Sequence, residues 1–389
     1  MRIAIVHNAY GRPSGEETVV ETHAALLAAH GHSVVRFQRS SAELETMTCG
    51  NARAFFTGIC NPIARRAFAR FLDRERPDLV HVHNLFPLIS PAILAECRRV
   101  PVVMTLHNFR LICPNALLLR DGRVCRDCLG GREYRCIFHN CEHNFPKSLG
   151  YALRTAFARR SGLLDNVRRF VCLTAFQRDL FVREGFPVEK MTVIPNAIPR
   201  AWLDTPPHEG GEFVGYVGRV SPEKDVPTLL EAARRLPDIP FKIAGSYWRM
   251  PEQIRNKTPN VEFVGHLELD ALRDFYRRMQ VLVFATRCYE NFPVTVLEAM
   301  AQGIPIVCAR IGGLPEIVEG RFYEPENTDD LAAQIQACWN AAVPAVEARP
   351  ETAGTAAFLP PGALGHDKAL REYHPDVVCA RLMELYEHC

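Results

Sequence analysis

Two glutamates that follow a hydrophobic run are the first residues whose types and spacing suggest chemistry. The run is VLVFA, at 281–285, and Glu290 and Glu298 follow it, eight positions apart. Asn291-Phe292-Pro293 between them indicates a loop that leads into a helix, because proline suits the first helical turn. We therefore expect Glu290 in a loop at the carboxyl end of a buried strand, and Glu298 one to two turns into the next helix. Ligands bind at that end of parallel sheets, and helix N-termini there favour anions.

A loop with two basic side chains follows a second hydrophobic run. The run is Phe213 to Val217, and the loop after it reads Gly218-Arg219-Val220-Ser221-Pro222-Glu223-Lys224. A third segment, Gly312-Gly313-Leu314-Pro315-Glu316, has the form of a turn. Each segment alone is also compatible with an ordinary solvent-exposed loop, and only their combination and order make the interpretation specific.

In this order, the three segments resemble the C-terminal half of retaining glycosyltransferases of family 4, which have the GT-B fold. The resemblance covers about 215–318, and weaker matches extend through the N-terminal half. It implies an α/β protein with two Rossmann-like parallel-sheet domains that face each other across a cleft. It also implies a hexosyltransferase that moves a sugar from a UDP- or GDP-sugar to a glycan or lipid-linked acceptor, with retention of configuration, in cell-surface polysaccharide synthesis.

The resemblance also implies roles for single residues. Arg219 and Lys224 would meet the diphosphate of the leaving nucleotide, where negative charge develops. Glu290 would hold the donor sugar, and Glu298 would accept hydrogen bonds from the ribose. No Asp-x-Asp occurs in the sequence, so we expect no catalytic metal. The predicted catalytic residues are His107, Glu290, Arg219 and Lys224. The predicted donor-binding residues are Gly15, Gly218, Arg219, Lys224, Gly265, Glu290, Asn291, Phe292, Pro293, Val294 and Glu298.

The N-terminal half contributes one histidine and one glycine to these sets. His107 follows the predicted strand at 102–106, at the carboxyl end where side chains of parallel sheets often bind ligands. The alternative is a histidine that only caps the end of this strand. Ser14-Gly15-Glu16-Glu17 resembles the family's Gly-Gly-x-Glu loop. Because Ser14 replaces the first glycine, only Gly15 is carried over. The absence of a G-x-G-x-x-G segment here argues against NAD.

A cysteine-rich insertion is expected at about 113–143. Cys125 and Cys128 have the two-residue spacing that lets both thiolates reach one tetrahedral zinc ion. Cys113 and Cys141 are the predicted second pair; the substitutes are Cys136, His139 and His143. Reduced thiols without a metal are the alternative. A structural zinc is therefore possible, and a cysteine-rich insertion at this place resembles a subset of the family.

The elements that position these residues alternate between strands and helices, which predicts parallel sheets. At 389 residues the chain suits two domains. We predict an acceptor domain at 1–197, a nucleotide-sugar domain at 198–374, and a terminal helix at 375–389 that crosses back to the first domain. Within them we expect an arginine-rich helical segment over 51–76, a helix over 91–98 and a long loop or irregular excursion over 341–367.

Charge is distributed unevenly along the chain, whose net charge is +2. Residues 1–197 hold 27 Lys and Arg against 17 Asp and Glu, or +10; the remainder holds 19 against 27, or −8. The basic half suggests an anionic acceptor or a peripheral contact with an anionic membrane surface, although arginine-rich helices also simply solvate well. We expect no nucleic-acid partner.

No run of 18 apolar residues occurs and the N-terminus does not read as a signal peptide, so we expect a cytoplasmic protein, peripheral on the membrane face if the basic half binds there. Two other function classes remain open. One is a GT-B sugar-nucleotide epimerase, and the other is a non-enzymatic zinc-containing module that binds nucleotides.

Overall fold

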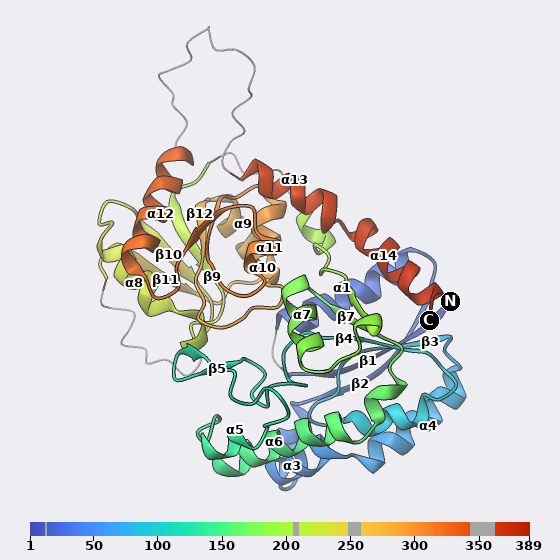
Figure 1. Ribbon diagram of the computed structural model, residues 1–389. Helices are drawn as coiled ribbons and strands as arrows, with labels where there is room; N and C mark the ends of the chain where they lie inside the picture. Colours follow the sequence, from blue (N-terminus) through green and yellow to red (C-terminus); the bar gives the residue numbers. More distant parts are fainter. Residues whose placement is uncertain (12–13, 205–209, 248–257, 343–361) are drawn as a thin grey trace. The chain divides into compact units, whose positions relative to one another are not determined.

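The computed structural model describes residues 1–389 except 12–13, 205–209, 248–257 and 343–361. The chain divides into two compact units. Unit 1 comprises Met1–Ala197 and Pro375–Cys389, and unit 2 comprises Ile198–His374. Each unit is built on a six-stranded parallel sheet, which confirms the predicted α/β class with two Rossmann-like sheets (Figure 1). None of the described helices has the length and apolar composition needed to cross a bilayer.

The sheet of unit 1 has the strand order β2-β1-β3-β4-β7-β8. The chain adds β2 on one side of β1 and then β3 on the other, pairing Ile3 with both Val34 and Leu79. The gap between the carboxyl ends of β1 and β3 is therefore a topological switch point, where ligands of open α/β sheets bind. The strands are β1 (Arg2–Ala9), β2 (Ser33–Ser40), β3 (Leu79–Asn84), β4 (Val102–Thr105), β7 (Arg169–Cys172) and β8 (Met191–Val193).

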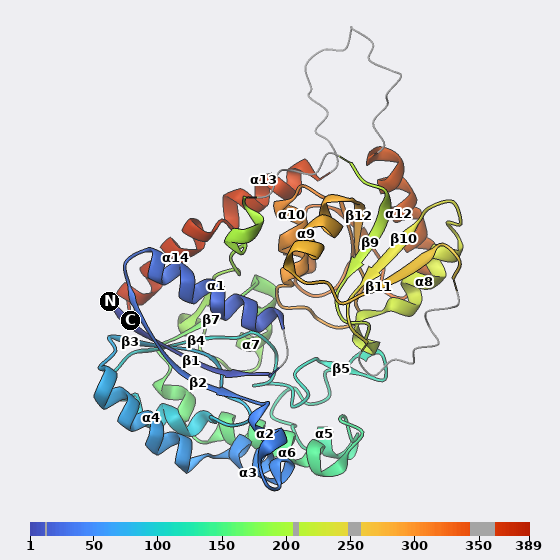
Figure 2. The same cartoon turned by 180° about the vertical axis from the view of Figure 1, so that it is seen from behind.

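Helices cover both faces of this sheet, as Figures 1 and 2 show. On one face, α1 (Gly15–Ala29) and α14 (Pro375–Glu387) bury Leu27 and Leu382 against Ile3 and Ile5. On the other, Phe68 of α4 packs edge-on against Phe37 of β2. The remaining helical elements are α2 (Glu43–Thr46), α3 (Gly50–Ile59), α4 (Pro62–Glu75), η1 (Pro91–Glu96), α5 (Arg135–Phe138), α6 (Phe145–Arg160), η2 (Leu163–Asn166), α7 (Ala175–Arg183) and η3 (Val188–Lys190).

Two helix predictions in unit 1 were confirmed in part. The segment 51–76 forms two helices, because Cys60 is extended and the Asn61 side chain caps α4 by accepting hydrogen bonds from the backbone N–H groups of Ile63 and Ala64. An Asn-Pro pair is typical of the N-terminus of a helix, but the arginine pattern continues across this pair and does not show the break. The segment predicted as a helix over 91–98 is the short 3-10 helix η1.

The cysteine-rich insertion begins with a small antiparallel hairpin, β5 (Leu119–Arg120) and β6 (Arg123–Val124). The two turn residues both have positive φ, 50° at Asp121 and 76° at Gly122. This is the tight turn that an Asp-Gly pair predicts. Helix α5 follows and packs against α6, so the insertion rests on a long helix of unit 1.

The sheet of unit 2 has the order β11-β10-β9-β12-β13-β14, with its switch point between β9 and β12. At the carboxyl edge of this sheet, the loops that follow β9 and β10 pack closely. A Cβ added at Gly245 would lie 1.8 Å from the carbonyl oxygen of Gly218. The loops after β9 and β10 are in contact at this point, and position 245 therefore accommodates only glycine. The strands are β9 (Phe213–Val217), β10 (Phe241–Ala244), β11 (Val261–Gly265), β12 (Met279–Phe284), β13 (Ile306–Ala309) and β14 (Arg321–Tyr323).

Helices α8 (Val226–Arg234) and α12 (Thr328–Ala342) share one hydrophobic core with this sheet. The expectation of an irregular excursion over 341–367 was wrong at both ends, because α12 continues to Ala342 and α13 begins at Ala363; the part at 343–361 lies outside the described residues. The remaining elements are η4 (Arg200–Trp202), η5 (Pro222–Lys224), α9 (Leu269–Arg277), α10 (Val294–Ala301), α11 (Leu314–Ile317) and α13 (Ala363–Glu372).

Candidate active site

A buried ion pair lies at the switch point of unit 2. Lys224, at the end of the loop after β9, places its Nζ 2.6 Å from Oε1 of Glu290, in the loop after β12. The hydroxyl of Thr286 donates to the same carboxylate oxygen at 2.9 Å. The side chains of Lys224 and Glu290 remain 17% and 14% exposed, so a ligand can reach both. The structure therefore brings together two predicted site residues that are 66 positions apart in the chain.

Each member of this pair keeps the other charged. Burial favours the neutral amine, but the Glu290 carboxylate outweighs it and raises the pKa of Lys224. Burial likewise opposes ionisation of Glu290, but the Lys224 ammonium and the hydrogen bonds to the carboxylate lower its pKa. A lone buried charge would be neutralised or destabilising, and a hydrogen-bonded pair avoids both outcomes. Lys224 can still donate two N–H groups to an anion.

The two loops are tied together by further contacts. The backbone N–H of Arg287 donates to the carbonyl of Glu223 at 2.9 Å, and the Arg287 guanidinium pairs with Asp225 at 2.7 Å. Asp225, in the left-handed conformation with φ 47°, also accepts a hydrogen bond from Thr228 at 2.8 Å. These bonds hold Lys224 and Glu290 at a fixed separation, which pre-organises the pair.

Arg219 lies in the same glycine-led loop, where Gly218 has φ 150°. Its Nη2 donates to Oε1 of Glu223 at 3.1 Å, and its side chain is 54% exposed. The Tyr216 hydroxyl donates to the Arg219 backbone carbonyl at 2.7 Å and fixes the turn. A guanidinium presents five N–H donors in a planar arrangement, which suits a charged ligand such as a diphosphate.

Helix α10 begins directly after the Glu290 loop. Pro293 is its N-cap, no side chain caps its first N–H groups, and Val294 is its first residue. Phe292, which is buried, packs edge-on against Tyr373 with ring centroids 5.1 Å apart, and so supports the loop. Asn291 and the first backbone N–H groups of α10 thus follow directly after Glu290. The uncapped N-terminus of this helix favours binding of an anion next to Glu290.

The structure gives Glu298 an environment different from that of Glu290. It lies in the second turn of α10, buried, and accepts a hydrogen bond from the Tyr276 hydroxyl at 2.9 Å. Burial raises the pKa of Glu298 to about 7. Gly265 ends β11 with φ 80°, and its carbonyl accepts from the backbone N–H of Gly245 at 2.7 Å. Neither residue contacts the Lys224–Glu290 pair through a hydrogen bond in the described structure.

In unit 1, the loop after β1 leads into α1 at Gly15, and Ser14 caps the helix by accepting from the Glu17 N–H at 3.4 Å. Glu16 accepts a hydrogen bond from the Tyr10 hydroxyl at 2.9 Å and lies 3.9 Å from Nδ1 of His7. Burial raises the pKa of Glu16 to about 7. This edge therefore holds a weakly acidic carboxyl beside the predicted Gly15.

His107 follows β4, and its Nε2 lies 2.8 Å from Nδ1 of His83. Burial lowers the pKa values of both rings well below the usual value, so both are neutral at pH 7. His107 thus contacts another side chain at the carboxyl edge of the sheet. The role that the resemblance implies for it stays a prediction.

The thiols of the cysteine-rich insertion gather around α5 and α6. Buried Cys128 and Cys136 pack together with Cys141 against Ala152 of α6. The Cys136 thiol donates a hydrogen bond to Cys141, which raises the pKa of Cys136 and lowers that of Cys141. Buried Cys113 interacts electrostatically with Cys128 and Cys141. Among the described residues no three of these sulfur atoms lie within 4.8 Å of one another, and the zinc stays a prediction.

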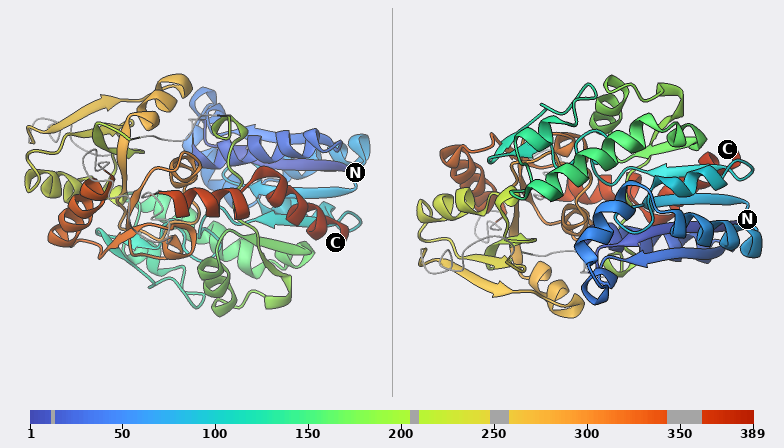
Figure 3. Two further views of the ribbon diagram at one scale, coloured as in Figure 1. Left: turned by 90° about the horizontal axis from the view of Figure 1, so that it is seen from above. Right: turned by 90° about the horizontal axis from the view of Figure 1, so that it is seen from below.

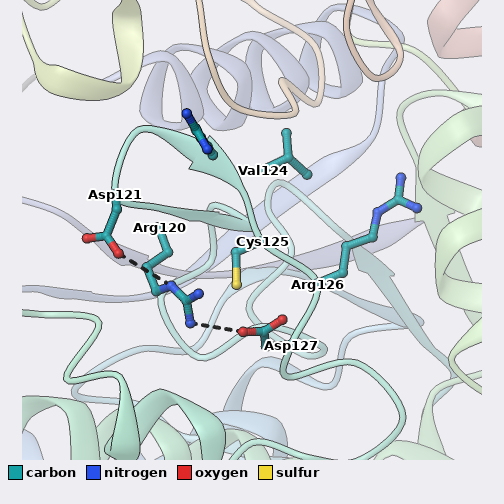
Figure 4. A pocket seen from close by; sticks show the side chains of 7 residues that line it. Arg120, Asp121, Val124, Cys125, Arg126 and Asp127 are labelled. Atoms are coloured by element: carbon teal, nitrogen blue, oxygen red, sulfur yellow. Dashed lines mark hydrogen bonds and ion pairs between the residues drawn. The ribbon is translucent and has the colours of Figure 1, made fainter.

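Cys125 differs from the other predicted ligands because it borders a pocket (Figure 4). Arg120 forms an ion pair with Asp127 at 2.9 Å across this pocket, and His139 lies 3.1 Å from the same carboxylate. The predicted substitute ligand His139 is therefore engaged with an acid. His143, also a predicted substitute, has positive φ and is exposed.

Sequence reasoning missed several residues of both edges. Asp225 was not predicted, because its partner Arg287 comes from a distant loop. Thr286 was also missed, although its partner Glu290 lies only four positions further along the chain. Glu16 carries no usable signal, because the family's Gly-Gly-x-Glu loop places its glutamate at Glu17. His81-x-His83 does carry one, because alternate residues of a strand project from the same face.

Comparisons with known proteins agree with this architecture. Residues 13–202 match the family described as Glycosyltransferase Family 4, and residues 211–341 match Glycosyl transferases group 1. An uncharacterized glycosyltransferase of Methanocaldococcus jannaschii is 25% identical over 274 residues, which are 68% of this chain and 66% of the relative. Glycogen synthase of Mycobacterium tuberculosis is 28% identical over 68% of this chain and 61% of its own length. The matches thus span slightly less than two thirds of these relatives.

Solved structures show the same fold. Sucrose-phosphate synthase of Thermosynechococcus elongatus has a TM-score of 0.69 at 17% identity, covering 100% of this chain and 98% of that one. The HepE protein of Anabaena in complex with UDP-glucose has a TM-score of 0.64 at 17% identity, covering 100% of both chains. These likenesses confirm the predicted GT-B class of fold. The family matches do not support the epimerase alternative. The chain belongs to the glycosyltransferases of the family 4, group 1 type.

Proposed function

We propose that this protein transfers a hexose from a UDP- or GDP-sugar to a glycan or lipid-linked acceptor, with retention of configuration, in the synthesis of a cell-surface polysaccharide. The Lys224–Glu290 pair at the switch point of unit 2 carries the proposal. The HepE complex named above contains UDP-glucose, which supports a nucleotide-sugar donor.

The chemistry follows from where charge develops. As the glycosidic bond breaks, the leaving nucleoside diphosphate gains negative charge, and pre-organised cations stabilise it most in the transition state. Lys224 and Arg219 supply those cations, and the uncapped amides of α10 add to them. With two cations and a helix N-terminus at one edge, the diphosphate needs no divalent metal. The acceptor attacks from the face that the diphosphate leaves, so no protein nucleophile is assigned.

Each other predicted residue takes a binding role in this proposal. Glu290, with Asn291 and the Phe292-Pro293 backbone, holds hydroxyl groups of the donor sugar. Glu298 accepts hydrogen bonds from the ribose, and Gly265 lies beside the base. In unit 1, His107 binds the donor sugar and Gly15 lets the backbone approach it; both assignments rest on the resemblance.

A surface of unit 1 supports a membrane-bound acceptor. Four large hydrophobic side chains of α3, α4, α5 and α6 are 57–79% exposed: Phe56, Ile63, Phe138 and Phe145. Arg53, Arg66 and Arg70 on α3 and α4 are exposed, and none of them forms an ion pair with a described residue. Helix α3 packs against α6, and both are visible from below in Figure 3. Aromatic side chains among unpaired arginines fit an anionic bilayer surface.

Vesicle sedimentation tests this surface. The protein should sediment with phosphatidylglycerol vesicles and stay in solution with phosphatidylcholine vesicles. Phe56→Asp with Ile63→Asp should abolish the binding, whereas Val188→Asp, at a site 61% exposed elsewhere in unit 1, should leave it intact. Equal sedimentation of all variants would contradict the assignment.

Nucleotide release tests the transfer itself. A screen of UDP- and GDP-sugars should find one donor that is slowly hydrolysed to the nucleoside diphosphate, in EDTA as well as in buffer. Lys224→Ala should abolish release, and Lys242→Ala, which removes the surface pair with Glu262, is the matched control in the same unit. Release of no nucleotide from any donor, with donor binding intact, would instead support the non-enzymatic nucleotide-binding module. A requirement for Mg²⁺ or Mn²⁺ would contradict the metal-free mechanism.

A further inference from the structure

Three buried histidines of unit 1 converge in the sheet–helix core. They are His23 of α1 and His81 and His83 of β3, and one ring nitrogen from each lies within 4.8 Å of the other two. The ring centroids of His81 and His83 are 4.3 Å apart, and those of His23 and His83 are 5.5 Å apart. In the part of the chain that the structure describes, no other three His, Cys, Asp or Glu side chains come together so closely.

The sequence explains why they meet. Residues 81 and 83 alternate along β3, so both side chains project from the same face of the sheet. Helix α1 packs across that face and directs His23 toward them; the exposed fractions of His23, His81 and His83 are 2%, 0% and 5%. A His-x-His pair on a strand with a third histidine from a neighbouring element forms a three-imidazole set, the kind that binds zinc in proteins.

The hydrogen bonding of the three rings is incomplete. Neither ring nitrogen of His23 has a partner, and Nε2 of His83 has none. A buried polar group without a partner is destabilising, so native cores rarely retain three such atoms without compensation. A cation that accepts lone pairs from these nitrogens supplies that compensation.

The surrounding contacts orient two of the rings as ligands. Nδ1 of His83 lies 2.8 Å from Nε2 of His107, so Nε2 of His83 is the ring nitrogen that is available as a metal ligand. His81 contacts Tyr386 of α14 through Nδ1 at 2.6 Å and Thr105 through Nε2 at 2.7 Å. Metal-bound histidines generally have their second nitrogen held in this way. His81 would exchange one of its two hydrogen bonds for the metal and keep the other.

We propose that His23, His81 and His83 bind one late first-row divalent cation, with zinc as the expected ion. The three imidazoles are neutral because burial lowers their pKa values, and neutral imidazole is the form that coordinates metal. The ion joins α1 to β3. Its role is structural, and it is separate from the transfer chemistry of unit 2.

Metal binding to the full-length protein tests the site. The protein is stripped of metal, equilibrated with Co²⁺ and freed of excess ion. The wild type should hold one more equivalent than His23→Gln, and the difference spectrum should contain d–d bands without sulfur-to-cobalt charge transfer. His30→Gln, at the C-terminal end of the same helix with its side chain 37% exposed, is the matched control and should bind like the wild type.

Thermal unfolding gives a second readout. Zn²⁺ should raise the Tm of the wild type more than that of His23→Gln, because a ligand that binds only the folded state stabilises it. Equal metal content and equal Tm shifts in the two proteins would overturn the site. Should His23→Gln not fold, the wild-type spectrum decides. Cobalt bands of purely thiolate character, or no cobalt uptake at all, would then overturn it.

Discussion

Each unit has a six-stranded parallel sheet with one switch point, and the two units differ in strand order and in the chemistry at those switch points. In unit 2 the loops after β9 and β12 hold a charged pair, Lys224 and Glu290, joined at 2.6 Å. In unit 1 the corresponding edge, after β1, β3 and β4, holds neutral imidazoles and a carboxyl, Glu16, whose pKa burial raises to about 7. The Lys224–Glu290 pair therefore stays charged under burial, whereas burial favours the neutral forms of the imidazoles and of Glu16.

This difference separates two tasks. A charge survives burial only beside an opposite charge with good geometry, and such a pair is suited to a diphosphate that brings charge of its own. Neutral imidazole rings can form hydrogen bonds with sugar hydroxyl groups, and imidazoles and thiols can bind soft metal cations. We therefore expect changes in unit 2 to affect donor binding and turnover, and changes in unit 1 to affect metals, the acceptor side and stability.

The largest expected effect concerns the cysteine-rich insertion of unit 1. We predict one structural zinc there, whose binding would contribute about 10 kcal/mol to folding of the segment. Cys128→Ser should remove about one equivalent of zinc in elemental analysis and expose the insertion to proteolysis. Cys60→Ser, at an exposed cysteine outside the insertion, is the control. Protein that is metal-free yet protease-resistant in this segment would show that the thiols are simply reduced.

The next largest effect is expected from the ion pair of unit 2. Lys224→Ala leaves Glu290 buried without its counter-charge, so the free energy of unfolding should fall by about 3 kcal/mol. Lys242→Ala, which removes the partner of Glu262, whose side chain is 61% exposed, should change it by less than about 1 kcal/mol. Urea denaturation of the three proteins measures both values. Similar losses in the two variants would mean that burial of the Lys224–Glu290 pair has no energetic consequence.

Arg219 should contribute less to stability and more selectively to binding. Its side chain is 54% exposed, so Arg219→Ala should unfold like the wild type. It should weaken donor binding by about 1.5–3 kcal/mol, the range for hydrogen bonds to charged groups. Calorimetric titration with the donor or its nucleoside diphosphate measures this. Arg277→Ala, on the exposed side of α9, serves as the control, and unchanged affinity in Arg219→Ala removes the assignment.

The smallest effect is a pH dependence from Glu298. Burial raises the pKa of its carboxyl from 4.5 to about 7, so the folded state holds a proton that the unfolded state releases between these values. The contribution of Glu298 to stability should therefore fall as pH rises from about 4.5 to about 7. Nucleotide affinity should instead rise by up to about tenfold between pH 6 and pH 8, because the carboxylate accepts ribose hydroxyls better than the acid does. Both contributions are measured as the difference between the wild type and Glu298→Gln, because Glu16 titrates in the same range and is unchanged in the variant. Identical pH profiles of stability and of affinity in the two proteins would exclude Glu298 as their source.

Local patterns predicted much of this fold and of the unit 2 site. The buried strand at 281–285, the loop with Glu290 and the helix with Glu298 follow from a hydrophobic run, a proline and their spacing. The Asp121-Gly122 turn is likewise a local property. The break between α3 and α4 was missed although Asn61-Pro62 signals it, because the arginine pattern continues across it.

Long-range pairings could not be predicted in the same way. That Lys224 bonds Glu290, or that His23 of a helix meets His81 and His83 of a strand, depends on which strands are neighbours and on where α1 crosses the sheet. Strand β14 is three residues long, too short for an alternating pattern, and pairs only with β13. In so short a segment the intrinsic strand propensity of the residues is a weak predictor, and pairing with a neighbouring strand determines whether a strand forms.

The central claim is that the Lys224–Glu290 pair is the donor site, and steady-state kinetics of Glu290→Gln test it most directly. With the donor found by the nucleotide-release screen, Glu290→Gln should lower kcat by about 10²-fold or more, equivalent to about 2.7 kcal/mol, because the carboxylate acts where charge develops. Glu298→Gln should chiefly raise the KM for the donor, and Glu262→Gln should behave like the wild type. A folded Glu290→Gln protein with wild-type kcat would contradict the account and remove the active site from this switch point.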